Sequence, residues 1–149
     1  MKFIENDGGR KAAGYKGNTG DCVTRAIAIA AQVPYKEVYD ELYERGTVFA
    51  KSSRSATAAR IRKYGASPRN GVHREIYDSY LSDLGWKWYP TMQIGQGCKV
   101  HLKADELPSG RIICRVSKHI VAVIDGAVHD TYDPTRGGTR CVYGYWAKN

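Results

Sequence analysis

Apolar residues in the first half of the chain recur at the three- and four-residue spacing of helices. The segment 22–32 (CVTRAIAIAAQ) is alanine-rich and carries Arg25 as its one charged residue, which predicts a helix buried on most sides. Pro34 ends this helix and opens a second one, which we expect Gly46 to end. Four helices are predicted, over residues 22–32, 35–45, 55–64 and 72–84.

After Gly85 the pattern changes to short apolar runs separated by turn residues. Asp125-Gly126 between two such runs is a strong signal for a hairpin with a two-residue turn. Strands are predicted over residues 86–89, 111–116, 119–124, 127–132 and 140–146, with a short one near Val100. Helices followed by an antiparallel sheet indicate an α+β fold.

The chain has 149 residues, of which 42% are hydrophobic and 26% charged, a balance typical of one globular domain over 1–149. Residues 1–18 are glycine-rich and are expected to form a loosely ordered lead-in. No apolar run approaches the ~20 residues that span a bilayer, and four cysteines without a CxxC pair favour reduced thiols. We therefore expect a soluble cytoplasmic protein that does not bind membranes, with a size and charge that suit a phage or bacterial origin.

The net charge of +8 is concentrated in one segment. Residues 46–74 hold seven basic residues and no acidic one, whereas the rest of the chain is nearly neutral. A solvated helix and loop is the simplest interpretation. The alternative is a surface for an acidic protein or a nucleic acid, centred on Arg54, Arg60 and Lys63.

Cys22 lies at the first turn of the predicted buried helix, directly after Gly20-Asp21. A helix N-terminus has partial positive charge and unpaired N–H groups, which stabilise a thiolate and can bind an oxyanion. These are the properties that a cysteine nucleophile needs.

His119 begins one strand of the predicted hairpin, and the register of the hairpin places a carboxylate beside it. With a two-residue turn, Val121 faces Asp130, so that His119 and Asp130 share a face as diagonal neighbours. Asp133 falls on the opposite face unless a bulge intervenes. The sequence thus offers a nucleophile, a base and an orienting carboxylate in the order Cys22, His119, Asp130.

Two segments resemble papain-like cysteine peptidases. The string TGDCVTRAIA (19–28) is similar to the nucleophile motif of ovarian-tumour-type deubiquitinases, and HIVAVIDGAVHDTYDP (119–134) is similar to the histidine region of bacteriocin-processing peptidases. The resemblance implies a papain-like fold, with a buried nucleophile helix in the N-terminal helical part packed on the C-terminal sheet. Papain relatives keep an oxyanion-stabilising glutamine where this chain has Lys16, so Asn18 with the backbone N–H of Cys22 is our candidate oxyanion hole.

A metal site is the less favoured interpretation of the remaining cysteines and histidines. Cys98 and His101 have a loose ligand spacing that Cys114 and Cys141 could complete, but zinc sites more often show two tight pairs. His73 and His101 have no partner in the sequence pattern, and His129 falls on the other face of the hairpin from His119, where we expect it to pack or to face solvent. We expect neither a metal nor a cofactor.

The predicted function is a papain-like cysteine peptidase or isopeptidase that hydrolyses a peptide or protein substrate. A transglutaminase-like acyltransferase shares the triad and differs only in the acyl acceptor. The alternative from another class is a non-enzymatic domain that binds nucleic acid or protein through the basic segment.

Overall fold

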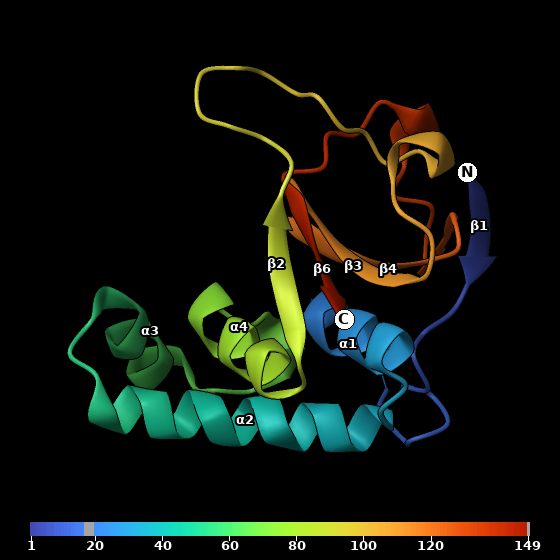
Figure 1. The fold of residues 1–149 in the computed structure, drawn as a ribbon. Helices are drawn as coiled ribbons and strands as arrows, with labels where there is room; N and C mark the ends of the chain where they lie inside the picture. The colour runs from blue at the N-terminus through green and yellow to red at the C-terminus, as the bar shows by residue number, and fades with distance from the viewer. Residues whose placement is uncertain (17–19, 149) are drawn as a thin grey trace.

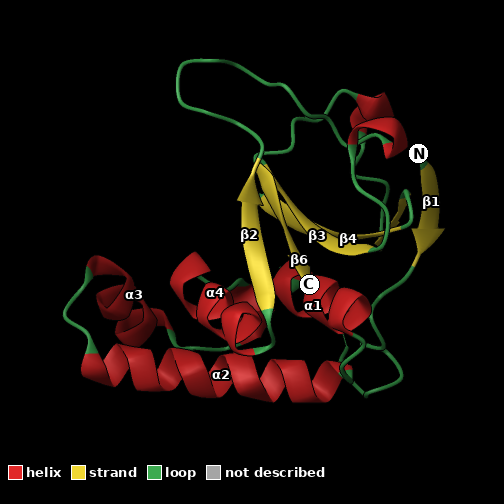
Figure 2. Ribbon diagram, viewed as in Figure 1, coloured by secondary structure: helices red, strands yellow, loops and turns green. Residues whose placement is uncertain are grey.

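The structure is a computed structural model that describes residues 1–16 and 20–148, in which four α-helices lie against a six-stranded mixed sheet. All four helices lie on one side of the sheet, and α1 packs directly on it (Figures 1 and 2). The helices are α1 (Cys22–Ala31), α2 (Tyr35–Ser52), α3 (Ala56–Tyr64) and α4 (Arg74–Asp83). The strands are β1 (Lys2–Glu5), β2 (Trp86–Pro90), β3 (Arg111–Val116), β4 (His119–Ile124), β5 (Ala127–Asp130) and β6 (Gly144–Lys148).

The strands follow the order β1-β5-β4-β3-β6-β2 across the sheet. The predicted hairpin is confirmed, because Ile124 pairs with Ala127 across a turn in which Asp125 and Gly126 both have positive φ. β3 and β4 form a second hairpin, in which Val116 pairs with His119. His119 is therefore the first residue of a central strand.

Two apolar clusters cover the two faces of the sheet. On the helical face, Ile113, Ile120 and Ala122 pack against the buried side chains of α1, α2 and α4. On the other face lie long loops with two short 3-10 helices, η2 (Ala104–Glu106) and η3 (Arg136–Gly138) (Figure 1), and residues such as Leu102 and Val142 pack there. The alternation of β4 side chains between these clusters explains why this strand is apolar along its whole length.

The end predicted for the second helix is wrong, because α2 continues through Gly46 to Ser52. Gly46 is buried, and a Cβ built on it would lie 3.1 Å from the Cβ of Ala66. The glycine therefore allows close approach of the 65–73 segment rather than ending the helix, and packing outweighs the ~1 kcal/mol that glycine costs in a helix interior. No helix in residues 1–16 or 20–148 is long and apolar enough to cross a membrane.

The lead-in prediction is also wrong for part of its length. Lys2–Glu5 form β1, which pairs in parallel with β5 and makes the sheet mixed rather than antiparallel. Asp7 then caps the following turn, since its carboxylate accepts hydrogen bonds from the N–H groups of Gly9 and Lys11. A four-residue edge strand in a segment that continues into glycines gave too weak a pattern to be recognised in the sequence.

Strand ends near the C-terminus differ from those predicted. β5 ends at Asp130 and β6 begins only at Gly144, whereas the region near Val100 contributes an isolated bridge between His101 and Cys141. The long connection between β2 and β3 is therefore a loop for most of its length (Figure 1).

Gly144→Ala tests the packing at the start of β6. A Cβ at this position would lie 2.3 Å from the Trp88 ring and 2.9 Å from the backbone oxygen of Tyr89. The Trp88 ring cannot retreat freely because it packs against the Trp146 ring, with the centroids 4.5 Å apart. We therefore expect the free energy of unfolding to fall by about 1–3 kcal/mol in denaturant titrations. Gly20→Ala is the control, since its nearest new contacts lie at 3.9 Å; equal stability of both variants would contradict this packing.

Candidate active site

Cys22 is the first residue of α1, and its side chain is partly exposed beside a cavity while the rest of the helix is buried. Eight consecutive residues, Val23 to Ala30, are buried, because the alanine-rich sequence allows the helix to pack closely between the sheet and α2. This packing fixes the position of α1, and Cys22 lies at its N-terminal end beside the cavity. The N–H groups of the first turn and the positive end of the helix dipole act on the sulfur there.

The structure brings together the histidine and the carboxylate that the sequence selected. His119 Nε2 lies 2.6 Å from Asp130 Oδ2, and both side chains are almost completely buried. Asp133 does not take part, since it is exposed and accepts a hydrogen bond from the N–H of Thr135. Asp130 occupies Nε2, which leaves Nδ1 of His119 as the ring nitrogen available to Cys22.

Electrostatics at this site favour a charged Cys22–His119 pair. Burial raises the pKa of Cys22, but hydrogen bonds from His119 and the Ile120 backbone and the charges of His119 and Arg25 outweigh it, so that the pKa is lowered. Burial lowers the pKa of His119, but hydrogen bonds with Asp130 and Cys22 raise it to about 9. Both shifts favour the thiolate–imidazolium pair over the neutral pair.

Arg25 connects the site to a buried ionic network that sequence reasoning missed. Its guanidinium donates to Asp21 on one side and to Asp130 Oδ1, at 3.2 Å, on the other. Asp21 also accepts a hydrogen bond from Tyr35 Oη at 2.6 Å. The only sequence signal was a lone arginine in an otherwise uncharged buried helix, three residues after the cysteine. Arg25 holds the carboxylate that in turn orients His119, so it is a positioning residue.

A cavity of about 470 Å³ opens beside Cys22 and His119. Its wall includes Tyr77 of α4 and Tyr132, whose half-exposed ring lies 5.4 Å from the His119 ring. The two tyrosines approach from segments far apart in the sequence, and no pattern in the chain indicated that they would meet here. The cavity gives a ligand access to the sulfur.

Asn18, the predicted oxyanion donor, lies outside the described residues. The backbone N–H of Cys22 remains the donor that its position at the start of α1 supplies.

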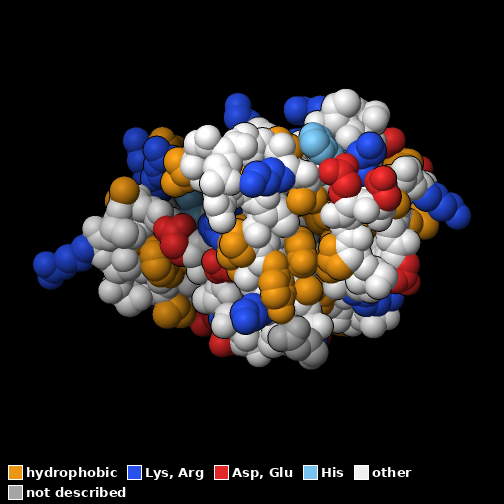
Figure 3. Space-filling model, turned by 45° about the horizontal axis from the view of Figure 1, so that its top comes forward, with side chains coloured by type: hydrophobic (Ala, Val, Ile, Leu, Met, Phe, Trp, Pro, Cys, Tyr) orange, Lys and Arg blue, Asp and Glu red, His pale blue; other side chains and the backbone are white. Residues whose placement is uncertain are grey.

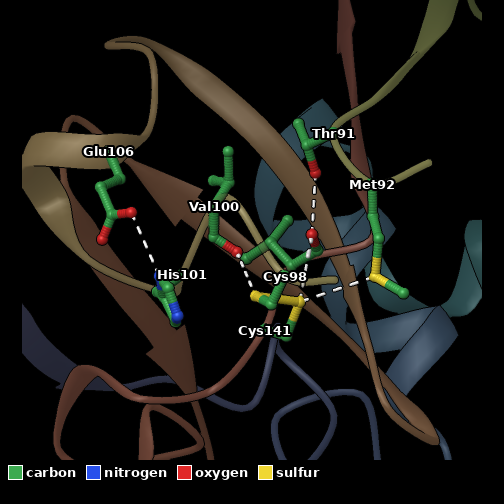
Figure 4. Close-up of a disulfide and its surroundings, with 8 residues drawn as sticks. Thr91, Met92, Cys98, Val100, His101, Glu106 and Cys141 are labelled. Carbon is green, nitrogen blue, oxygen red and sulfur yellow. Dashed lines mark hydrogen bonds and ion pairs between the residues drawn. A yellow bond between two sulfur atoms is a disulfide. The ribbon is translucent and has the colours of Figure 1, made fainter. Parts of the chain in front are cut away.

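The other cysteines do not form a second site. Cys98 and Cys141 form a disulfide, shown in Figure 4, which corrects the expectation of reduced thiols and removes both from the metal site that we weighed. Cys114 is buried in the apolar cluster on the loop side of the sheet, and burial raises the pKa of its thiol. The described part of the chain contains no group of three or more His, Cys, Asp or Glu residues that could hold a metal.

The basic segment 46–74 is partly structural. Arg62 donates to the Ala50 and Ser53 carbonyl oxygens, and Arg74 pairs with Asp78 and stacks on the Trp88 ring. Figure 3 shows Lys and Arg side chains projecting at the end of the molecule where α3 lies, interspersed on this face with acidic ones. A contiguous basic surface of the kind that binds nucleic acid is not evident on this face.

Comparison of the chain with protein-family models, with curated proteins and with solved structures found no match in any of the three. Any assignment of function therefore rests on the geometry and electrostatics of the site around Cys22, His119 and Asp130.

Proposed function

We propose that this protein is a papain-like cysteine peptidase or isopeptidase with Cys22 as nucleophile, His119 as general acid and base, and Asp130 as the orienting carboxylate. The observation that carries the proposal is the 2.6 Å contact between His119 Nε2 and Asp130, which leaves the second ring nitrogen for the partly exposed thiol of Cys22.

The arrangement of elements supports the same proposal. The papain-like plan places the nucleophile at the start of a buried helix, the histidine at the start of a strand and its partner on the next strand. Cys22 begins α1, His119 begins β4 and Asp130 ends β5, the neighbour of β4 in the sheet. Cys114 has none of these features, since its buried thiol has a raised pKa and no histidine beside it in the described structure.

Acylation begins when the Cys22 thiolate attacks a substrate carbonyl carbon and forms the C–S bond. The carbonyl oxygen becomes an oxyanion, which the N–H of Cys22 at the helix N-terminus stabilises. The tetrahedral intermediate then collapses, the C–N bond breaks and His119 gives its proton to the leaving amine. Asp130 holds the imidazole in position throughout.

Deacylation reverses the role of His119. The neutral imidazole takes a proton from water, the resulting hydroxide attacks the thioester carbonyl, and the C–S bond breaks to release a carboxylic acid and the Cys22 thiolate. An amine in place of water gives acyl transfer by the same steps, so the acceptor distinguishes a peptidase from an acyltransferase.

The pH dependence of Cys22 alkylation tests the proposed ion pair. The thiolate is lost as pH falls through the lowered pKa of Cys22, and the imidazolium is lost as pH rises through the raised pKa of His119, about 9. We therefore expect iodoacetamide to alkylate Cys22 faster at pH 7 than an ordinary exposed thiol such as that of glutathione, and kcat/KM for a peptide substrate to fall above about pH 9.

The Asp130→Asn variant is compared with the native protein in the same alkylation experiment. Without the carboxylate the pKa of His119 is expected to drop, and alkylation at pH 7 to slow by about tenfold as the thiolate population falls. Mass spectrometry of tryptic peptides separates Cys22 from Cys114, which serves as an internal control because it is buried. Equal labelling rates of Cys22 in both proteins, or slow labelling of Cys22 in the native protein, would exclude the triad.

A further inference from the structure

Besides the Cys22–His119 pair, the charged side chains that line the cavity are all positive. Apart from the His119 imidazole, its charged lining residues are Arg25, Arg74, Arg115 and Lys118, and no aspartate or glutamate contributes to the described wall. Two of these cations have partners: Arg25 pairs with Asp21 and Asp130, and Arg74 pairs with Asp78 at 3.4 Å.

Of the four cations that line this cavity, Arg115 and Lys118 have no carboxylate partner among the described residues. Arg115 is half-buried, and its guanidinium lies 5.8 Å from the centre of the Tyr143 ring. Lys118 is exposed in the β3–β4 turn, directly before His119. A half-buried arginine that has lost part of its hydration without gaining an anion is costly, and an anionic ligand would remove this cost.

A second cavity of about 890 Å³ adjoins the first, with Gly71 and Val72 lining both. Its apolar wall includes Leu42, Ile61 and Ile76, while Arg60 and Lys63 are its charged lining residues. The described walls of both cavities therefore contain cations and no carboxylate, and the second adds an apolar surface to the first.

We propose that the substrate is an acidic polypeptide segment with a carboxylate side chain next to the scissile bond. Arg115 and Lys118 bind that carboxylate beside Cys22, and the adjoining cavity takes an apolar side chain of the same segment, with further acidic groups near Arg60 and Lys63. This inference rests on the proposed function. A polypeptide is favoured over a nucleic acid because it supplies an acyl carbon for the thiolate, apolar side chains and negative charges in one chain.

Binding to the Cys22→Ala variant tests the proposal without requiring catalysis. The probes are a fluorescein-labelled dodecapeptide of four Gly-Leu-Glu repeats and its Gly-Leu-Gln counterpart, measured by fluorescence anisotropy. We expect the glutamate peptide to bind at least about tenfold more tightly at low salt, with the difference shrinking as salt is added.

A double variant that neutralises both cations tests whether they cause the preference for glutamate. Arg115→Gln combined with Lys118→Gln is expected to abolish the preference for glutamate while leaving the affinity for the glutamine peptide unchanged. Lys51→Gln combined with Arg54→Gln is the matched control, since both side chains are exposed and line neither cavity. It also removes two positive charges and should keep the preference.

Three outcomes overturn the proposal: equal affinities for the two peptides, no binding of either, or displacement of the glutamate peptide by a single-stranded DNA dodecamer at lower concentration than by unlabelled peptide. Failure of the proposed function is a separate result, because slow alkylation of Cys22 in the native protein leaves these binding measurements unaffected.

Discussion

Cys22→Ala lowers the kcat/KM for peptide hydrolysis by at least about a thousandfold under the proposed mechanism. The reason is that the acyl-enzyme cannot form without the sulfur, and the remaining donors of the site catalyse only weakly. The substitution removes one atom from a partly exposed side chain that lines a cavity, so we expect the fold to remain. Hydrolysis of an acidic fluorogenic peptide measures the loss.

Cys114→Ala is the matched control for this experiment. It also removes a free thiol, but one that lies in the apolar cluster on the opposite side of the sheet from the helices. We expect a lower unfolding free energy with kcat/KM nearly unchanged. Comparable hydrolysis by the Cys22→Ala variant and the native protein would refute the catalytic role of Cys22.

Arg25→Met is expected to lower the free energy of unfolding by about 3–5 kcal/mol. The guanidinium lies between two buried carboxylates, Asp21 and Asp130, which are 2% and 3% exposed. Its removal breaks a buried ion pair with each of them and leaves Arg10 for Asp21 and His119 for Asp130. Methionine matches much of the volume of the arginine stem, so the loss measures the charge rather than a cavity. Denaturant titration followed by circular dichroism gives the free energy.

Two further variants separate the electrostatic role of Arg25 from a packing role. Arg54→Met removes an exposed arginine and should change stability by less than about 0.5 kcal/mol. Asp21→Asn combined with Arg25→Met should recover part of the loss, because it removes a buried carboxylate that would keep only Arg10 as a cationic partner. The positioning role also predicts a shifted pH profile of Cys22 alkylation in the Arg25→Met variant. An unshifted profile would limit Arg25 to stability.

Local sequence patterns predicted most elements of the fold but not all of their ends. The hairpin at Asp125-Gly126 follows from a turn that needs two positive φ values, and α3 begins where Ser55 caps it through the N–H of Ala58. Gly46 misled the prediction because its packing against Ala66 is a tertiary contact. β1 was missed because a parallel edge strand depends on a partner more than 120 residues away.

In the candidate site, too, local sequence patterns predicted some features, whereas tertiary packing decided others. The sequence by itself determined the order of Cys22, His119 and Asp130. It also determined the helix that begins at the cysteine and the hairpin register that places the histidine beside its carboxylate, because both follow from short-range periodicity. Only the tertiary structure decided that Arg25 joins Asp130 to Asp21, that Cys98 bonds to Cys141, and that Arg115 and Lys118 line the cavity beside the thiol. Those contacts join segments far apart in the chain, and their geometry is set by how α1 packs on the sheet, which no local pattern encodes.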